Sequence, residues 1–105
     1  MSRIDTLKEF LSDDPKDSFS RYALAMEYAK LERYADAIME FRTVVENDPN
    51  YVAAYYQLGK TYEHQGQLDS ARQTYVQGIE VARQAGDDHT KEELTAALEI
   101  LNGAG

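Results

Sequence analysis

The sequence contains no cysteine, which excludes a disulfide framework and a thiolate metal site. Among its 105 residues, no apolar run approaches the roughly 20 residues that a membrane-spanning helix requires. The first five residues, Met1 to Asp5, lack the apolar core of a secretory signal peptide. We therefore expect a single domain over residues 1–105, located in the cytoplasm and without a membrane partner.

Positive charge is also scarce. Lysine and arginine together number 11 against 19 aspartate and glutamate residues, which gives a net charge of −8 and a pI near 4.6. Binding to a nucleic acid needs clustered lysine and arginine side chains that neutralise phosphates. The composition therefore argues against a nucleic-acid partner, and the acidity is explained by its effect on solubility.

Groups that support catalysis are few. His64 and His89 are the only histidines, and the chain has no glycine-rich phosphate loop and no His–Glu pair at the spacing of metal ligands. The acidic pairs Asp13-Asp14, Asp87-Asp88 and Glu92-Glu93 lie beside predicted helix ends, where capping and the helix dipole favour them. We therefore expect no enzymatic activity, no metal site and no cofactor.

The feature that is present is a repeat of 34 residues. Shifting residues 55–75 back by 34 positions places similar side chains on one another. The matching pairs are Leu58 and Leu24, Gly59 and Ala25, Tyr62 and Tyr28, Ala71 and Ala37, Tyr75 and Phe41, Tyr56 and Tyr22, and, before this stretch, Pro49 and Pro15. A fixed period of this length is typical of arrays of helical repeats.

The second copy resembles the tetratricopeptide repeat, TPR. The resemblance rests on the aromatic, leucine, small and aromatic residues of Tyr55-x-x-Leu58-Gly59-x-x-Tyr62, on Ala71-x-x-x-Tyr75, and on the proline before each copy. In the first copy Arg21 replaces the opening aromatic residue. The resemblance implies an all-α fold, a right-handed superhelix of antiparallel helix pairs. It implies a scaffold rather than one defined activity, because function lies in sites placed on a fold.

The same shift extends to the beginning of the chain and divides it into four parts. Ile4 falls on Ile38 and Leu7 on Phe41, so the first helix is interpreted as a half-repeat, the second helix of a pair. The predicted parts are the half-repeat helix 3–12, the first repeat 18–49, the second repeat 52–84 and a C-terminal capping helix 90–102. Terminal units of repeat arrays are usually atypical because they cover the open ends of the stack.

Local signals predict how these helices begin and pack. Asp17 or Ser18, and Asn50, are candidate N-caps for the first helix of each repeat, and Thr90 with Glu93 fits a capping box. Glycine inside a helix costs about 0.5–1 kcal/mol relative to alanine. Gly59 and Gly78 are therefore expected where a neighbouring helix approaches closely, Gly78 against the last helix.

In the TPR family, the first helix of each repeat lines a concave groove that binds peptide segments of partner proteins. Carried over to this chain, the resemblance implies a groove formed by Phe19, Tyr22, Met26, Lys30, Tyr56, Gln57, Lys60 and His64. The alternative is that the apolar members of this set are covered by the chain's own terminal helix. Chaperone-tail binding is disfavoured, because Tyr22, Met26, Ala53 and Gln57 stand where that subfamily has lysine and asparagine.

A second reading is self-association. Helical arrays usually need about three repeats to be stable alone, and this chain has two full repeats with a half-repeat and a cap. The first helix lacks its natural partner, so part of Ile4, Leu7, Phe10 or Leu11 is expected to stay uncovered. Two chains that cover these surfaces would form a homodimer.

Overall fold

Residues 2–103 of the computed structural model form six α-helices and no strand. The helices are α1 (Arg3–Asp13), α2 (Ser18–Lys30), α3 (Tyr34–Asn47), α4 (Val52–His64), α5 (Leu68–Ala85) and α6 (Asp88–Gly103). None of the helices in this range combines the length and the apolar character needed to cross a membrane.

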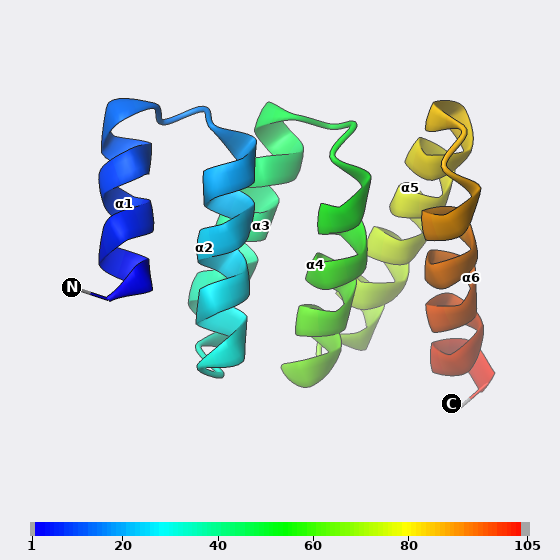
Figure 1. The fold of residues 1–105 in the computed structure, drawn as a ribbon. Helices are drawn as coiled ribbons and strands as arrows, with labels where there is room; N and C mark the ends of the chain where they lie inside the picture. The colour runs from blue at the N-terminus through cyan, green and yellow to red at the C-terminus, as the bar shows by residue number, and fades with distance from the viewer. Residues whose placement is uncertain (1, 104–105) are drawn as a thin grey trace.

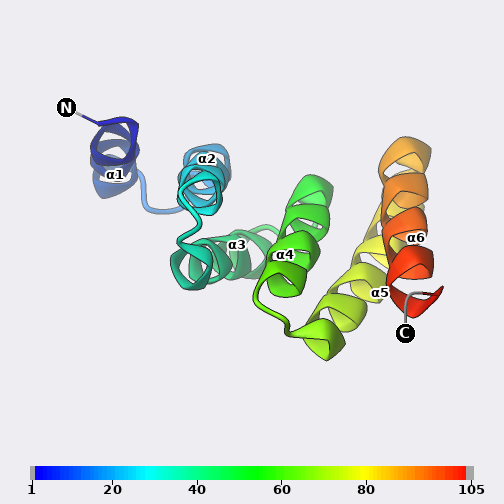
Figure 2. The same cartoon turned by 90° about the horizontal axis from the view of Figure 1, so that it is seen from below.

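The helices stack in two layers along one direction. Figure 1 shows α2, α4 and α6 in front of α3 and α5, and the view from below in Figure 2 shows the same two rows. Each helix packs against the next one in the chain, and α4 also packs against α6. The predicted all-α superhelix of paired helices is confirmed. Helices α1 and α6 lie at its opposite ends (Figure 1).

The helix starts show where local prediction was right and where it was wrong. Asp17 caps α2, because its carboxylate accepts hydrogen bonds from the Ser20 amide at 3.3 Å and hydroxyl at 2.6 Å. Asn50 does not cap α4, whose N-cap is Tyr51 with no side-chain bond. Thr90 is not a cap either: α6 begins at Asp88, two residues before the predicted start.

Asp87 takes the role that was predicted for Thr90. Its carboxylate accepts from the Thr90 amide at 3.0 Å and from the Thr90 hydroxyl at 2.8 Å. This is the same pair of bonds that Asp17 makes with Ser20. The short carboxylate reaches the free amides of the first turn from outside the helix, so Thr90 acts as a donor inside the helix rather than as an acceptor at its end.

These two caps predict a pH dependence of stability. Hydrogen bonds from Ser20 and Thr90 lower the pKa of Asp17 and of Asp87 below the ordinary value of 3.8. Because the folded-state pKa is the lower one, the stabilisation is complete above the unfolded-state pKa and is lost as the pH falls through the folded-state pKa. Replacing both residues with asparagine keeps a neutral cap that does not titrate. Urea unfolding between pH 6 and pH 2.5 should therefore show a smaller loss of stability in the double variant; equal losses would contradict the prediction.

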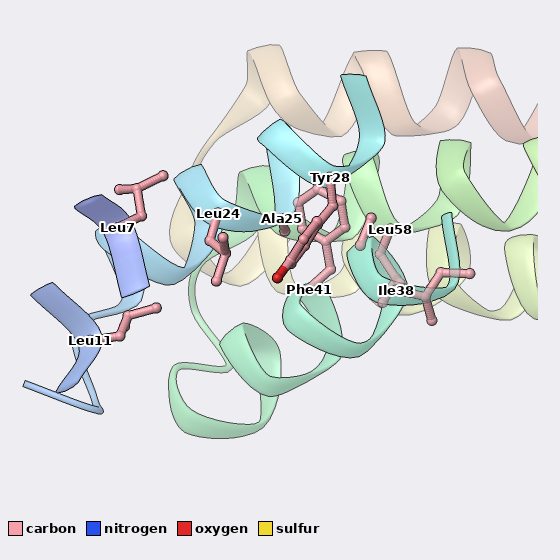
Figure 3. Packing of buried hydrophobic residues seen from close by; sticks show 9 residues of the cluster. Leu7, Leu11, Leu24, Ala25, Tyr28, Ile38, Phe41 and Leu58 are labelled. Carbon is pink, nitrogen blue, oxygen red and sulfur yellow. The ribbon is translucent and has the colours of Figure 1, made fainter. Parts of the chain in front are cut away.

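The buried side chains form two clusters. The first extends over α1, α2, α3 and α4 and includes Leu7, Leu24, Phe41 and Leu58. Figure 3 shows Leu7 at one side of this cluster and Leu58 towards the other, with Leu24 and Phe41 between them. The second joins α4, α5 and α6 around Tyr75, which is fully buried. Leu58 belongs to the first cluster although it lies on α4, so this side chain connects the second repeat to the first.

Both interior glycines lie at close approaches between helices. A Cβ atom at Gly59 would collide with the ring of Tyr75 from α5. A Cβ atom at Gly78 would lie 2.6 Å from the Cβ of Tyr55 and 3.1 Å from the Cδ1 of Leu94. The close packing predicted at Gly59 is thus confirmed, and Gly78 adjoins α4 as well as the last helix.

Candidate functional site

The main cavity of interest lies on the exposed face of α2. It has a volume of about 530 Å³ and is lined by seven residues of α2 and one of α1. The lining residues are Arg3, Phe19, Tyr22, Ala23, Met26, Glu27, Ala29 and Lys30. We call this cavity the α2 pocket. Four of the predicted groove residues, Phe19, Tyr22, Met26 and Lys30, therefore line one pocket.

The α2 pocket exists because α2 is apolar on two sides. Leu24, Ala25 and Tyr28 recur at helical spacing and are buried in the core. Phe19 and Met26 lie elsewhere around the helix, and the Phe19 side chain is 72% exposed. Phe19 and Met26 line the same pocket as Tyr22, and a contiguous apolar patch rimmed by polar residues is typical of an interaction surface.

Tyr22 forms both a pocket wall and part of the core. Its ring is half-buried and lies edge-on to the ring of Phe41, with the two ring centroids 5.7 Å apart. The centroid of the Tyr51 ring lies 5.2 Å from that of Tyr22. Burial raises the pKa of Tyr22, and the neighbouring Tyr51 and Glu93 raise it further, while a hydrogen bond with the Gln57 side chain lowers it. Truncating Tyr22 would therefore disturb folding and the pocket together.

Charged residues at one end of the α2 pocket were not predicted from the sequence. Arg3 Nε lies 2.8 Å from Glu27 Oε1, and Lys30 Nζ lies 3.0 Å from Glu27 Oε2. A signal for Arg3 was present in the 34-residue register. Arg3 occupies the position of Ala37 and Ala71, both fully buried, and a long charged side chain there must point to a different environment.

The predicted residues of α4 lie outside the α2 pocket. Tyr56 is half-buried and packs against the second cluster, and Gln57 and Lys60 are also half-buried. His64 is exposed and stacks on Tyr34, with ring centroids 5.1 Å apart. The structure thus brings the α2 residues together in a pocket and distributes the α4 residues along the neighbouring helix.

Two titratable groups outside the α2 pocket, Tyr75 and His89, have structural partners. The Tyr75 hydroxyl donates a hydrogen bond to Glu63, and burial followed by this bond raises the pKa of Tyr75. On the surface of α6, His89 Nε2 lies 3.6 Å from Glu93 Oε1. Across residues 2–103, no group of three or more histidine, aspartate or glutamate side chains is arranged to hold a metal ion.

Comparison with known proteins bears on the family and the fold. The family model described as tetratricopeptide repeat matches residues 22–88. A TPR repeat-containing protein of Pseudomonas aeruginosa is 31% identical over 101 residues, covering 96% of both chains.

Solved structures show the same architecture. A tetratricopeptide repeat domain protein from Salinibacter ruber has a TM-score of 0.80 and 45% identity, covering 85% of this chain and 99% of that one. The TPR2B domain of yeast Sti1, solved as a complex with pHsp70, has a TM-score of 0.90 and covers 97% of this chain and 82% of that one. At 20% identity, this second likeness shows the fold alone. The match of the family model over residues 22–88 and the full-length likeness to the Pseudomonas protein show that the chain belongs to the tetratricopeptide repeat family.

Proposed function

We propose that this protein is a non-enzymatic interaction module that binds a peptide segment of a partner protein on the α2 face. The observation that carries the proposal is Phe19, an aromatic side chain that is 72% exposed at a pocket of about 530 Å³. Tyr22 and Met26 supply further apolar wall. A large apolar group at a preformed cavity provides an anchor point, and aromatic and methionine side chains are enriched in such interfaces.

The proposed groove continues from α2 onto α4. Tyr56 and Gln57 are half-buried on the helix that follows α2 in the same layer, and Lys60 and His64 lie one and two turns further along it. A bound segment would cross from the α2 pocket over these residues. Lys60 and His64 would then contact polar or acidic groups at the edge of the segment.

The test begins with phage-displayed random peptides selected on the intact protein. Selected peptides are resynthesised, and their affinities for three proteins are measured by calorimetry: the native chain, Phe19→Ala and Phe10→Ala. Phe10 is a matched control because it is an exposed phenylalanine, 54% accessible, that does not line the α2 pocket. Loss of a central aromatic anchor typically costs about 2 kcal/mol or more, which is roughly thirtyfold in affinity.

We expect Phe19→Ala to weaken binding by this amount with little change in melting temperature, since the ring is mostly in water. Phe10→Ala should leave binding unchanged. The proposal fails if selection enriches no peptide, or if the enriched peptides bind Phe19→Ala as tightly as the native protein.

Self-association through the terminal helices is the second candidate function. Among the described helices α1 packs against α2 only, and Phe10 on α1 is 54% exposed. Phe10 occupies the register position of Val44, which is fully buried in the first repeat. A homodimer that covers α1 would restore this burial.

Light scattering tests this second candidate. If α1 forms a dimer interface, the native protein should have twice the monomer mass at high concentration, and Phe10→Glu should reduce it to the monomer mass, because burying an unpaired charge is costly. Phe19→Glu is the control and should leave the mass unchanged. A monomeric native protein over the whole concentration range would exclude the dimer.

A further inference from the structure

Two cations share one carboxylate at one end of the α2 pocket. Arg3 and Lys30 both pair with Glu27, whose side chain is 13% exposed, whereas theirs are 66% and 75% exposed. This end of the pocket therefore carries one positive charge in excess, in a protein whose net charge is −8. The local charge is opposite in sign to that of the whole chain.

Both cations have spare hydrogen-bonding capacity. Among residues 2–103, the Arg3 guanidinium makes one ion pair, through Nε, so the donors on its two terminal nitrogens remain for another acceptor. A guanidinium binds a carboxylate through two parallel bonds, and the lysine ammonium adds up to three donors. Glu27 alone does not saturate this arrangement.

We propose that Arg3 and Lys30 recognise an acidic side chain of the bound segment, and that Glu27 competes with that acid for the two cations. This inference rests on the proposed function and names the chemistry of the partner. An apolar side chain of the segment contacts Tyr22 and Met26, and an aspartate or glutamate of the same segment binds Arg3 and Lys30.

The helix sets the spacing between these two contacts. Lys30 lies six residues beyond the midpoint of Tyr22 and Met26. At 1.5 Å per helical residue this is about 9 Å, and an extended segment rises about 3.3 Å per residue. The acid should therefore lie about three residues from the apolar anchor.

The charge of the whole chain limits how acidic the segment is. A net charge of −8 repels acidic segments over the Debye length, about 10 Å at 0.1 M salt. Within the α2 pocket, the attraction exists at the end where Arg3 and Lys30 lie. The partner that fits is thus a mostly apolar or neutral segment with one or two acids, and a long acidic run is disfavoured.

Six synthetic peptides test the inference. Each has nine residues, an acetylated N-terminus, an amidated C-terminus and a central phenylalanine, with glutamate, glutamine or lysine three residues before or after it. They are titrated into ¹⁵N-labelled protein, and backbone NMR shifts give the affinity and the place of binding. We expect shifts at Phe19, Met26 and Lys30. In one of the two placements, before or after the phenylalanine, the glutamate peptide should bind about fivefold tighter than the glutamine peptide. The lysine peptide of that placement should bind weakest.

Three variants assign the effect to the named charges. Glu27→Gln removes the competing carboxylate. It should raise the affinity for the glutamate peptide several-fold and leave the affinity for the glutamine peptide unchanged. Lys30→Gln keeps the Arg3–Glu27 pair and should remove the preference for glutamate. Lys8→Gln is the control: it removes the same charge from an exposed position of α1 outside the pocket, and should keep the preference. If Glu27→Gln lowers the melting temperature, the test rests on the peptide affinities of Lys30→Gln and its control Lys8→Gln.

The outcomes separate this inference from the proposed function. Equal affinities for all peptides, with shifts at Phe19 and Met26, would overturn the acidic recognition and leave segment binding intact. Tightest binding of a lysine peptide would also overturn it. Absence of shifts at the pocket for every peptide would count against both proposals.

Discussion

Replacement of Tyr75 by alanine should lower the free energy of unfolding by about 3–5 kcal/mol, the range for truncating a large buried aromatic side chain. Tyr75 is fully buried at the centre of the second cluster, and its ring fills the space left by the missing side chain of Gly59. Removing it leaves a cavity between α4 and α5 that backbone atoms cannot fill. The loss is a large part of the 5–15 kcal/mol that stabilises a typical domain. Urea unfolding followed by circular dichroism measures it.

Tyr75→Phe is the matched control, because it keeps the ring and removes only the hydroxyl that donates to Glu63. A hydrogen bond to a charged group contributes about 1.5–3 kcal/mol, and the lower end applies here because water can hydrate the half-buried Glu63. If Tyr75→Ala costs less than about 1 kcal/mol, or no more than Tyr75→Phe, the ring does not support the packing between α4 and α5.

Leu58→Ala should be the next most damaging change, with a cost of about 2–5 kcal/mol, the range for a well-packed leucine. Leu58 is 4% exposed and, unlike Tyr75, belongs to the cluster that joins the two repeats. Its loss therefore weakens the contact between repeats as well as the core. Calorimetric and urea unfolding should show reduced stability with the helices still formed in the native state.

The chain offers a control of the same chemistry. Leu68 lies at the start of α5 and is 42% exposed, so Leu68→Ala should change stability by about 0.5 kcal/mol or less. A cost below 1 kcal/mol for Leu58→Ala, or equal costs at the two leucines, would show that the face of α4 has been misassigned.

The core could be predicted from the sequence because its positions recur. Leu24 and Leu58, or Phe41 and Tyr75, perform the same packing task in successive units, so similarity at a fixed spacing revealed them before any contact was known. Gly59 was predictable for another reason, since an unfavourable residue in a helix interior needs a compensating close contact.

The charged end of the α2 pocket could not be predicted in the same way. The pairing of Arg3 with Glu27 occurs once in the chain and depends on how α1 lies against α2, which no periodicity records. Tyr22 posed a similar problem, because the resemblance to the TPR family placed it in the groove without showing that its ring reaches Phe41. Single contacts between helices follow from tertiary geometry, whereas repeated ones are visible in the sequence.

The side chains of α1 have a consequence for protein engineering. Arg3 occupies the position of the fully buried Ala37, and Phe10 corresponds to Val44 in one repeat and Gly78 in the other. These are positions where a paired helix comes close. Fusing an additional unit in front of α1 would bring its helix against two bulky side chains, so such an extension would first require small residues at both sites. Duplicating residues 16–49 in place avoids this problem, because the new helix pair is inserted between α3 and α4 and leaves α1 at its end of the stack. The new joint, Asp48-Pro49-Lys16-Asp17, has the same residue types as the turn between α1 and α2. A longer array should therefore be built from the middle of the chain.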